Sequence, residues 1–235
     1  EFVRTNINGT FNLLNLIKNF IESDKDKKFR KFIHVSTDEV YGTLGSEGSF
    51  CEHTPYAPNN PYSASKAASD FLVRSYIKTY NLPAIVTNCS NNFGPFQDGE
   101  KFIPKIISCV LNNENIPIYG DGTNIRDWLY VGQHVEVLLQ MLSQEMKYSK
   151  YNIGGGVELS NVELASNILT YLEKEGRVTP GTVKLNYITD RPGHDFRYAI
   201  NDTRLRSEIS LGALKNSFET DLETTIKWYI ENKGL

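Results

Sequence analysis

Cysteine, clustered positive charge and long apolar runs are all scarce in this chain of 235 residues. Its three cysteines form no Cys-x-x-Cys pair, which argues against a disulfide framework and a zinc site. His53 and His134 show no ligand spacing, so no metal is expected. The net charge of −3 disfavours a nucleic-acid partner. Neither a signal peptide nor an apolar run of about 18 residues is present, which indicates a cytoplasmic protein that makes no membrane contact.

A glycine-rich phosphate-binding loop is also missing. Gly42, Gly45 and Gly48 have the spacing of such a loop and follow an apolar run. A phosphate-binding loop must also open a helix, whose amide end holds the phosphates. Prolines at 55, 58 and 61 follow instead, and proline forbids that helix. We therefore interpret this glycine spacing as a flexible surface loop.

Alternating strands and helices are what the sequence does contain. Strands are predicted at 32–36 and 82–88, with a long helix at 62–80 between them. This order predicts an α/β fold with a doubly wound parallel, Rossmann-type sheet. The sheet lacks its first βαβ unit, because only a helical pattern at 2–20 precedes the first strand.

The second part of the chain predicts a smaller, mixed α/β lobe. Its expected helices are 101–111, 131–142, 161–173 and 218–232, and its expected strands are 116–119 and 151–153. We therefore predict that residues 1–93 are the remaining part of a nucleotide-binding Rossmann domain and that residues 94–235 bind substrate. Residues 127–153 are expected to pack back on the first domain.

Two adjacent acids, Asp38 and Glu39, follow the first strand directly. An acidic pair is most often a surface turn or a helix cap. At the carboxyl end of an apolar strand, however, the two carboxyls share a water-poor site, and their pKa values separate. One can then act as an acid and the other as a base, as an elimination requires.

Tyr62 and Lys66 lie four residues apart at the start of the long helix, on one face of it. The spacing alone is weak, because Tyr229 and Lys233 repeat it near the end of the chain. Ionising a free tyrosine of pKa ~10 at neutral pH costs ~4 kcal/mol. A nearby ammonium group supplies part of that energy.

Three cations are candidates for binding a diphosphate. Arg126 and Arg191 offer planar forks that suit phosphate oxygens, and Lys101 offers a point charge. Surface ion pairs are the alternative for each. Arg126 stands among aromatic residues and Arg191 in a Pro/Gly turn, which favours binding.

Seven motifs, in order along the chain, resemble the dTDP-glucose 4,6-dehydratase family of extended short-chain dehydrogenases/reductases. They are Ser-Thr-Asp-Glu-Val-Tyr-Gly at 36–42, Tyr-Ser-Ala-Ser-Lys at 62–66, Asn-Cys-Ser-Asn-Asn-Phe-Gly-Pro at 88–95, Glu-Lys-Phe-Ile-Pro at 100–104, Ile-Arg-Asp-Trp-Leu-Tyr-Val at 125–131, Tyr-Asn-Ile-Gly-Gly at 151–155 and Asp-Arg-Pro-Gly-His-Asp at 190–195. The resemblance departs at the front, where the family's glycine-rich NAD loop has no counterpart. The sequence is therefore expected to be an N-terminally truncated form or a chain that cannot bind NAD unaided.

The resemblance implies a role for each matching residue. Tyr62 would deprotonate the sugar C4 hydroxyl with help from Lys66. Glu39 would take the C5 proton, Asp38 would protonate the departing C6 hydroxyl, and Thr37 would orient the ring. NAD contacts are implied for Thr5, Tyr62, Lys66 and Asn92, and nucleotide-sugar contacts for Thr37, Asn91, Lys101, Pro117, Ile118, Tyr119, Arg126, Asn161, Arg191 and His194. The family also implies a homodimer formed through the helices near 5–20 and 62–80.

Three other functions stay open at this point. A UDP-glucose 4,6-dehydratase or a nucleotide-sugar 4-epimerase would share most of the motifs. An epimerase needs only the Tyr62 and Lys66 half of the site, so the acidic pair separates it from a dehydratase. A non-catalytic nucleotide-sugar-binding fragment is the third alternative.

Overall fold

A parallel sheet forms the first part of the fold. The computed structural model describes residues 1–23, 28–209 and 216–232. In these residues β1 (Phe32–Thr37), β2 (Ala84–Cys89) and β6 (Lys150–Ile153) form one sheet in the order β1-β2-β6, with both pairs parallel. The predicted parallel α/β sheet is confirmed. Strand β6 comes from the 127–153 segment and pairs directly with β2.

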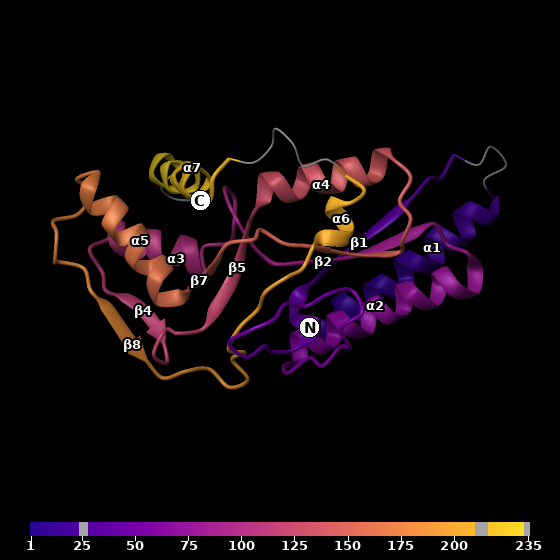
Figure 1. Cartoon of the computed structure of the whole chain (residues 1–235), viewed down its shortest axis with the longest axis horizontal. Helices are drawn as coiled ribbons and strands as arrows, with labels where there is room; N and C mark the ends of the chain where they lie inside the picture. The colour runs from indigo at the N-terminus through magenta and orange to yellow at the C-terminus, as the bar shows by residue number, and fades with distance from the viewer. Residues whose placement is uncertain (24–27, 210–215, 233–235) are drawn as a thin grey trace.

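Helices cover both faces of this sheet (Figure 1). On one face lie α1 (Gly9–Ser23), which continues from the π-helix η1 (Val3–Asn8), and α2 (Pro61–Tyr80). Their apolar residues pack on β2 in one buried cluster, which includes Leu14, Val73 and Val86. On the other face, α4 (Val131–Ser143) and α6 (Thr203–Arg206) form a second cluster with β2 and β6. The result is a three-layer sandwich.

Helix α2 begins where its local sequence dictates. Asn60 is the N-cap: its side chain accepts from Ser63 N at 2.9 Å, and Ser63 Oγ accepts from Asn60 N at 3.3 Å. Pro61 occupies the first helical position, where its missing N–H costs nothing. The helix ends at Asn81, whose left-handed φ of 51° closes the last turn. The first turn of α2, which carries Tyr62, is therefore fixed by its own cap.

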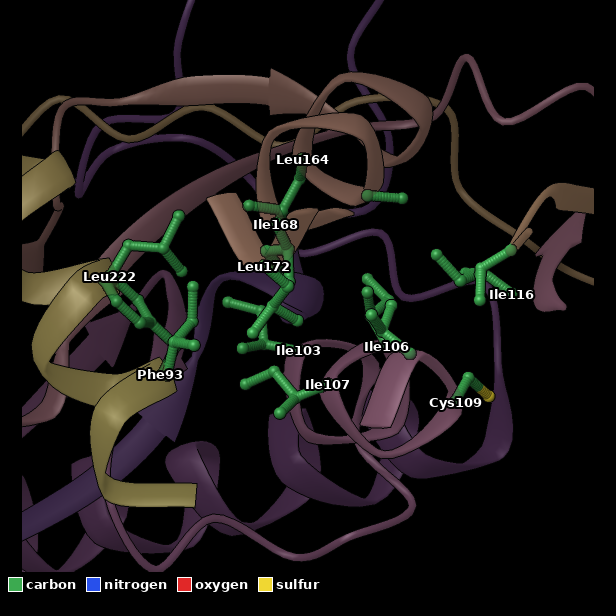
Figure 2. Close-up of a cluster of buried hydrophobic side chains, with 14 of the residues drawn as sticks. Phe93, Ile103, Ile106, Ile107, Cys109, Ile116, Leu164, Ile168, Leu172 and Leu222 are labelled. Atoms are coloured by element: carbon green, nitrogen blue, oxygen red, sulfur yellow. The ribbon is translucent and has the colours of Figure 1, made fainter. Parts of the chain in front are cut away.

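A second group of elements lies beside the sandwich. It contains β3 (Asn91–Phe93), β5 (Ile125–Tyr130) and β7 (Glu158–Ser160) in one sheet, and β4 (Ile116–Tyr119) paired with β8 (Leu185–Ile188) in another. Helices α3 (Phe102–Leu111), α5 (Asn161–Lys174) and α7 (Phe218–Glu231) pack around them. Figure 2 shows their shared core, in which Leu164, Ile168 and Leu172 of α5 face Ile103 and Ile107 of α3.

The predicted elements appear with ends shifted by a few residues at most, but several strands were missed. Strands β3, β5, β7 and β8 are short or carry polar residues, so neither a long apolar run nor a clean alternation marks them. The loop at 42–48 opens no helix, as predicted. The loop was expected to be flexible, but its main chain is held by Arg197. Arg197 Nη1 donates to Gly45 O at 3.3 Å and to Gly48 O at 3.0 Å. Residue Lys233, from the second Tyr/Lys spacing, lies outside the described residues.

No helix in the described residues is long and apolar enough to cross a membrane. No group of His, Cys, Asp and Glu side chains in the same ranges could hold a metal ion.

The core around α5 yields a stability prediction. Leu164 is fully buried, so Leu164→Ala should lower the free energy of unfolding by about 2–5 kcal/mol through lost burial and a residual cavity. Chemical denaturation followed by circular dichroism measures the change. Leu139→Ala, at a position of α4 that is 55% exposed, is the matched control and should change stability by about 0.5 kcal/mol or less. Equal losses in the two variants would contradict this packing.

Candidate active site

The three parallel strands β1, β2 and β6 end together at one edge of their sheet. Thr37, the last residue of β1, is in register with Cys89 at the end of β2, and Cys89 is in register with Ile153 at the end of β6. The segments that follow, which begin at Asp38, Ser90 and Gly154, therefore lie along one edge. Loops at the carboxyl ends of parallel strands are where α/β sheets bind ligands.

Thr37 organises the acidic pair. It caps the short 3-10 helix η2 (Asp38–Tyr41), because its Oγ1 accepts from Glu39 N at 3.3 Å. The same hydroxyl donates to Asp38 Oδ1 at 3.3 Å. One side chain thus holds both acids in a single tight turn.

The carboxyl group of Asp38 is buried, and only one of its two oxygens has a hydrogen-bond partner in the described residues. Its side chain is 1% exposed, and its Oδ2 has no hydrogen-bond partner in the part of the chain that the structure describes. Burial, and then the negative charges of Glu39 and Asp127, hold its pKa well above the ordinary value. Asp38 therefore holds its proton to higher pH than an ordinary aspartate does, which suits it to donate a proton.

Glu39 has a different environment. Burial raises its pKa too, but a hydrogen bond from Asn60 Nδ2 at 3.4 Å favours the ionised form. The positive charges of Arg191 and Arg126 act in the same direction. The two neighbouring carboxyl groups thus differ in their tendency to ionise. Asp38 is the better proton donor and Glu39 the better base.

Tyr62 shares the field of these carboxyls. Burial, followed by the charges on Glu39 and other acidic groups that include Asp38, raises its pKa to about 12. Lys66, one turn further along α2, donates from Nζ to Val35 O at 2.8 Å, and burial lowers its pKa. The sequence led us to expect a lowered Tyr62 pKa. The structure shows the opposite direction, because the ring is desolvated beside two acids and the ammonium is held by β1.

A buried network of polar side chains holds the end of β1, just before the Asp38–Tyr41 turn. The sequence analysis did not predict this network. Asn88 Nδ2 donates to Thr37 O and to Asp70 Oδ2, both at 3.1 Å. Asp70 Oδ2 also accepts from Tyr56 OH at 2.8 Å. The available signal was Asn88 itself, a polar residue inside the wholly buried strand β2. Such a residue must find partners, and here the partners fix the end of β1.

Arg126 is buried and mostly satisfied by the main chain. It is 5% exposed, with Nη1 donating to Ile125 O at 2.7 Å and Nη2 to Asp195 O at 2.9 Å. Its guanidinium carbon lies 4.3 Å from the ring centre of Tyr198. Its charge still reaches both acids of the site, since it favours ionisation of Asp38 and Glu39.

The other expected binding residues lie on several elements of the fold. Arg191 is exposed, and its charge acts on Glu39. His194 Nδ1 lies 2.7 Å from Asp190 Oδ1. Asn91 Oδ1 is buried and has no partner within the described ranges. The remaining positions are Thr5 on η1, Lys101 before α3, Pro117 and Tyr119 on β4, and Asn161 at the start of α5.

One expected side-chain contact, that of Ile118, needs correction. Ile118 is fully buried in the core of the second group, because alternate residues of β4 point inward. Its side chain therefore cannot contact a ligand. Asn92 turns its amide inward, where Nδ2 donates to Ser90 O at 3.0 Å and Oδ1 lies 2.8 Å from His134 Nδ1.

Fold and site together define a Rossmann-type α/β protein with an acid pair at the carboxyl edge of its sheet. The chain belongs to the family described as GDP-mannose 4,6 dehydratase, whose family model matches residues 1–220. It is 44% identical to a probable dTDP-glucose 4,6-dehydratase of Sinorhizobium fredii and 46% identical to the dTDP-glucose 4,6-dehydratase of Neisseria gonorrhoeae, covering 67% and 69% of those proteins and 99% of itself. The crystal structure of the Bacillus anthracis dTDP-glucose 4,6-dehydratase in complex with NAD superposes with a TM-score of 0.86 at 43% identity, over 98% of this chain and 69% of that one.

The buried acid predicts a pH-dependent cost to stability. Between the ordinary pKa of 3.8 and the raised value, the folded chain holds a proton on Asp38 that the unfolded chain releases. Stability therefore falls as pH rises through that range. Asp38→Asn removes this loss, so the variant should be more stable than wild type at pH 7, with the difference vanishing below pH 3.8.

Thermal unfolding at several pH values measures this effect. Asp98→Asn, at an exposed position, controls for the substitution itself. An Asp38→Asn protein that is no more stable than wild type at neutral pH would contradict a raised Asp38 pKa.

Proposed function

We propose that the protein is a dTDP-glucose 4,6-dehydratase, which converts dTDP-glucose to dTDP-4-keto-6-deoxyglucose and water with NAD as cofactor. The observation that carries the proposal is the pair Asp38 and Glu39, whose carboxyl groups have different surroundings and whose charges both act on Tyr62. Loss of water across C5–C6 needs one acid and one base on the same sugar. A 4-epimerase has no use for that pair.

The residues at the sheet edge fit a nicotinamide cofactor in part. Tyr62 and Lys66 stand at the carboxyl end of β1, and no group in the described residues hydrogen-bonds the Tyr62 hydroxyl. We assign them to the cofactor together with Thr5, which is exposed on η1. Asn92 contributes through its main chain if its amide keeps the inward contacts. A bound NAD would supply hydride transfer, from sugar C4 and back to C6.

Proton removal at C4 falls to Tyr62. The phenol needs a positive neighbour to ionise, since burial and acidic charges oppose its ionisation here. Lys66 is the ammonium on the same helix face, and we propose that it shifts from Val35 O toward the phenol in the loaded enzyme. Thr37 orients the ring: we propose that its one hydroxyl proton turns from Asp38 Oδ1 to the C4 oxygen when the sugar binds.

Elimination falls to the acidic pair. With C4 oxidised, the C5 proton is acidic, and ionised Glu39 accepts it. Asp38 gives its proton to the C6 hydroxyl, which leaves as water, and a C5=C6 double bond forms. When the hydride is added at C6, Glu39 gives the proton back to C5. The burial that raises the pKa of Asp38 suits it to the role of acid.

The nucleotide is assigned to the second group of elements. Arg191 and Lys101 are exposed cations suited to the diphosphate. We assign Asn91, Arg126, Asn161 and His194 to the same ligand, and Pro117 and Tyr119 to the base. In this division residues 1–93 with 127–153 hold the cofactor, and the rest of 94–235 holds the nucleotide-sugar together with Asn91 and the turn at Thr37.

The function is tested by incubating the protein with NAD and dTDP-glucose, and in parallel with UDP-glucose. A 4-keto product, detected by its absorbance in alkali, is expected from dTDP-glucose. Preference for UDP-glucose would contradict the proposed substrate. An epimerised sugar formed without loss of water would contradict the proposed reaction.

Glu39→Gln should stall the reaction after oxidation, because no base removes the C5 proton. We expect the rate of product formation to fall by about 10²–10⁴-fold. The exposed Glu47→Gln is the matched control and should retain the wild-type rate. Activity near wild type in Glu39→Gln would remove Glu39 from its role as base.

We also propose that the protein is a cytoplasmic homodimer. The three cysteines are free, as is usual in a reducing compartment. Helix α1 presents the apolar residues Leu13, Leu16 and Phe20 to solvent, exposed by 44%, 67% and 53%. A face of this kind, beside α2, suits a symmetric contact between two copies.

Leu16→Glu should therefore abolish the dimer while the fold persists, since Leu16 is mostly exposed in one copy. Light scattering after size-exclusion chromatography gives the mass. Leu139→Glu, on the exposed side of α4, is the control and should leave the dimer intact. A Leu16→Glu protein that stays dimeric would move the interface elsewhere.

A further inference from the structure

Asn60 uses both ends of its side-chain amide. Its Oδ1 accepts from Ser63 N at 2.9 Å and caps α2, and its Nδ2 donates to Glu39 Oε2 at 3.4 Å. The cap fixes the amide orientation, because only the oxygen can accept from Ser63 N. The amino group is thereby turned toward Glu39.

Capping alone does not require asparagine. Ser and Asp cap helices about as well, but neither carries an N–H donor at the far end of its side chain. Asn60 Nδ2 is also the hydrogen-bond donor that the structure shows for the Glu39 carboxylate within the described residues. The residue therefore joins two parts of the site, the η2 turn and the first turn of α2.

The loop that holds Asn60 is anchored from the other side as well. Asn59 Nδ2 donates to Asp195 Oδ1 at 2.6 Å, and Asp195 Oδ2 accepts from Tyr198 OH at 2.5 Å. This contact ties the start of α2 to the segment that carries Arg191. Asn60 thus has a fixed main chain from which its side chain can hold Glu39.

We propose that Asn60 is a positioning residue that ties the Glu39 carboxylate to the cap of α2 and so holds the base in a fixed relation to Tyr62. The inference rests on the proposed function and names a further residue of that site. The hydrogen bond also favours the ionised form of Glu39, which is the form that accepts a proton.

Several other groups act on Glu39 or are acted on by it, and they set the background for a titration. They are Arg126 and Arg191, which favour its ionised form, Asp195, which opposes it, and Asp38, Tyr62 and Tyr198, which feel its charge. Asn60→Ser leaves these groups in the chain and adds no charge. A shift in the Glu39 titration of that variant therefore reports the lost hydrogen bond.

Two substitutions separate positioning from capping. Asn60→Ser keeps a capping oxygen and removes the donor, and Asn60→Asp keeps the cap and places a negative charge beside Glu39. At acidic pH, where Glu39 is protonated in both the folded and the unfolded chain, both should melt at the wild-type temperature. The Glu39 carboxyl, followed by carbon-13 NMR and identified by its loss in Glu39→Gln, should titrate at higher pH in Asn60→Ser and at still higher pH in Asn60→Asp.

Ser63→Ala is the control, because it weakens the capping box without touching Glu39. It should lower the melting temperature and leave the titration in place. In the protein supplied with NAD, Asn60→Ser should lower kcat at acidic pH, recover toward wild type as pH rises, and leave KM unchanged.

The titration needs no turnover, so the two proposals can fail separately. A Glu39 titration that is unmoved in both Asn60 variants overturns the role of Asn60, whether or not the enzyme dehydrates dTDP-glucose. A wild-type protein with no dehydratase activity but with the expected titration shifts overturns the proposed function alone.

Discussion

The burial of one carboxyl group, that of Asp38, is the constraint on which the rest of the site depends. At 1% exposure and with one oxygen unpartnered in the described residues, the group has a pKa well above that of a surface aspartate. Because Asp38 resists ionisation, its neighbour Glu39 is the member of the pair better placed to carry the negative charge. An acid and a base of nearly identical chemistry thus acquire opposite tasks from their surroundings.

The scaffold holds this arrangement in place from three sides. Thr37 caps the turn that carries the acids, and Asn88 holds the Thr37 carbonyl from within β2. The capped start of α2 brings Tyr62 to the same edge of the sheet. These contacts come from segments far apart in sequence, which the parallel sheet aligns by ending its strands together (Figure 1). The fold thereby supports a site that costs stability, as reactive sites commonly do.

Local patterns predicted the parts of the molecule whose sequence carries its own signal. The apolar runs of β1 and β2, and the Asn-Pro start of α2, were sufficient to find those elements and the acid pair between them. Strand β5 was missed because its polar residues, Arg126 and Asp127, are buried by tertiary contacts that a local pattern does not contain. The raised pKa of Tyr62 was missed for a related reason, since it depends on desolvation and on charges brought in by another strand. Motif resemblance supplied residue roles, but it could not show that Ile118 faces the core.

The central claim is that oxidation, loss of water and reduction occur on one hexose without release. Its most direct test mixes two forms of dTDP-glucose. One has carbon-12 throughout and deuterium at C4, and the other has carbon-13 throughout and ordinary hydrogen at C4. Mass spectrometry of the product then shows which molecules carry deuterium. The account predicts that deuterium appears at C6 of the carbon-12 molecules only. Deuterium at C6 of the carbon-13 molecules would show exchange between sugars and contradict a single site that keeps its intermediate.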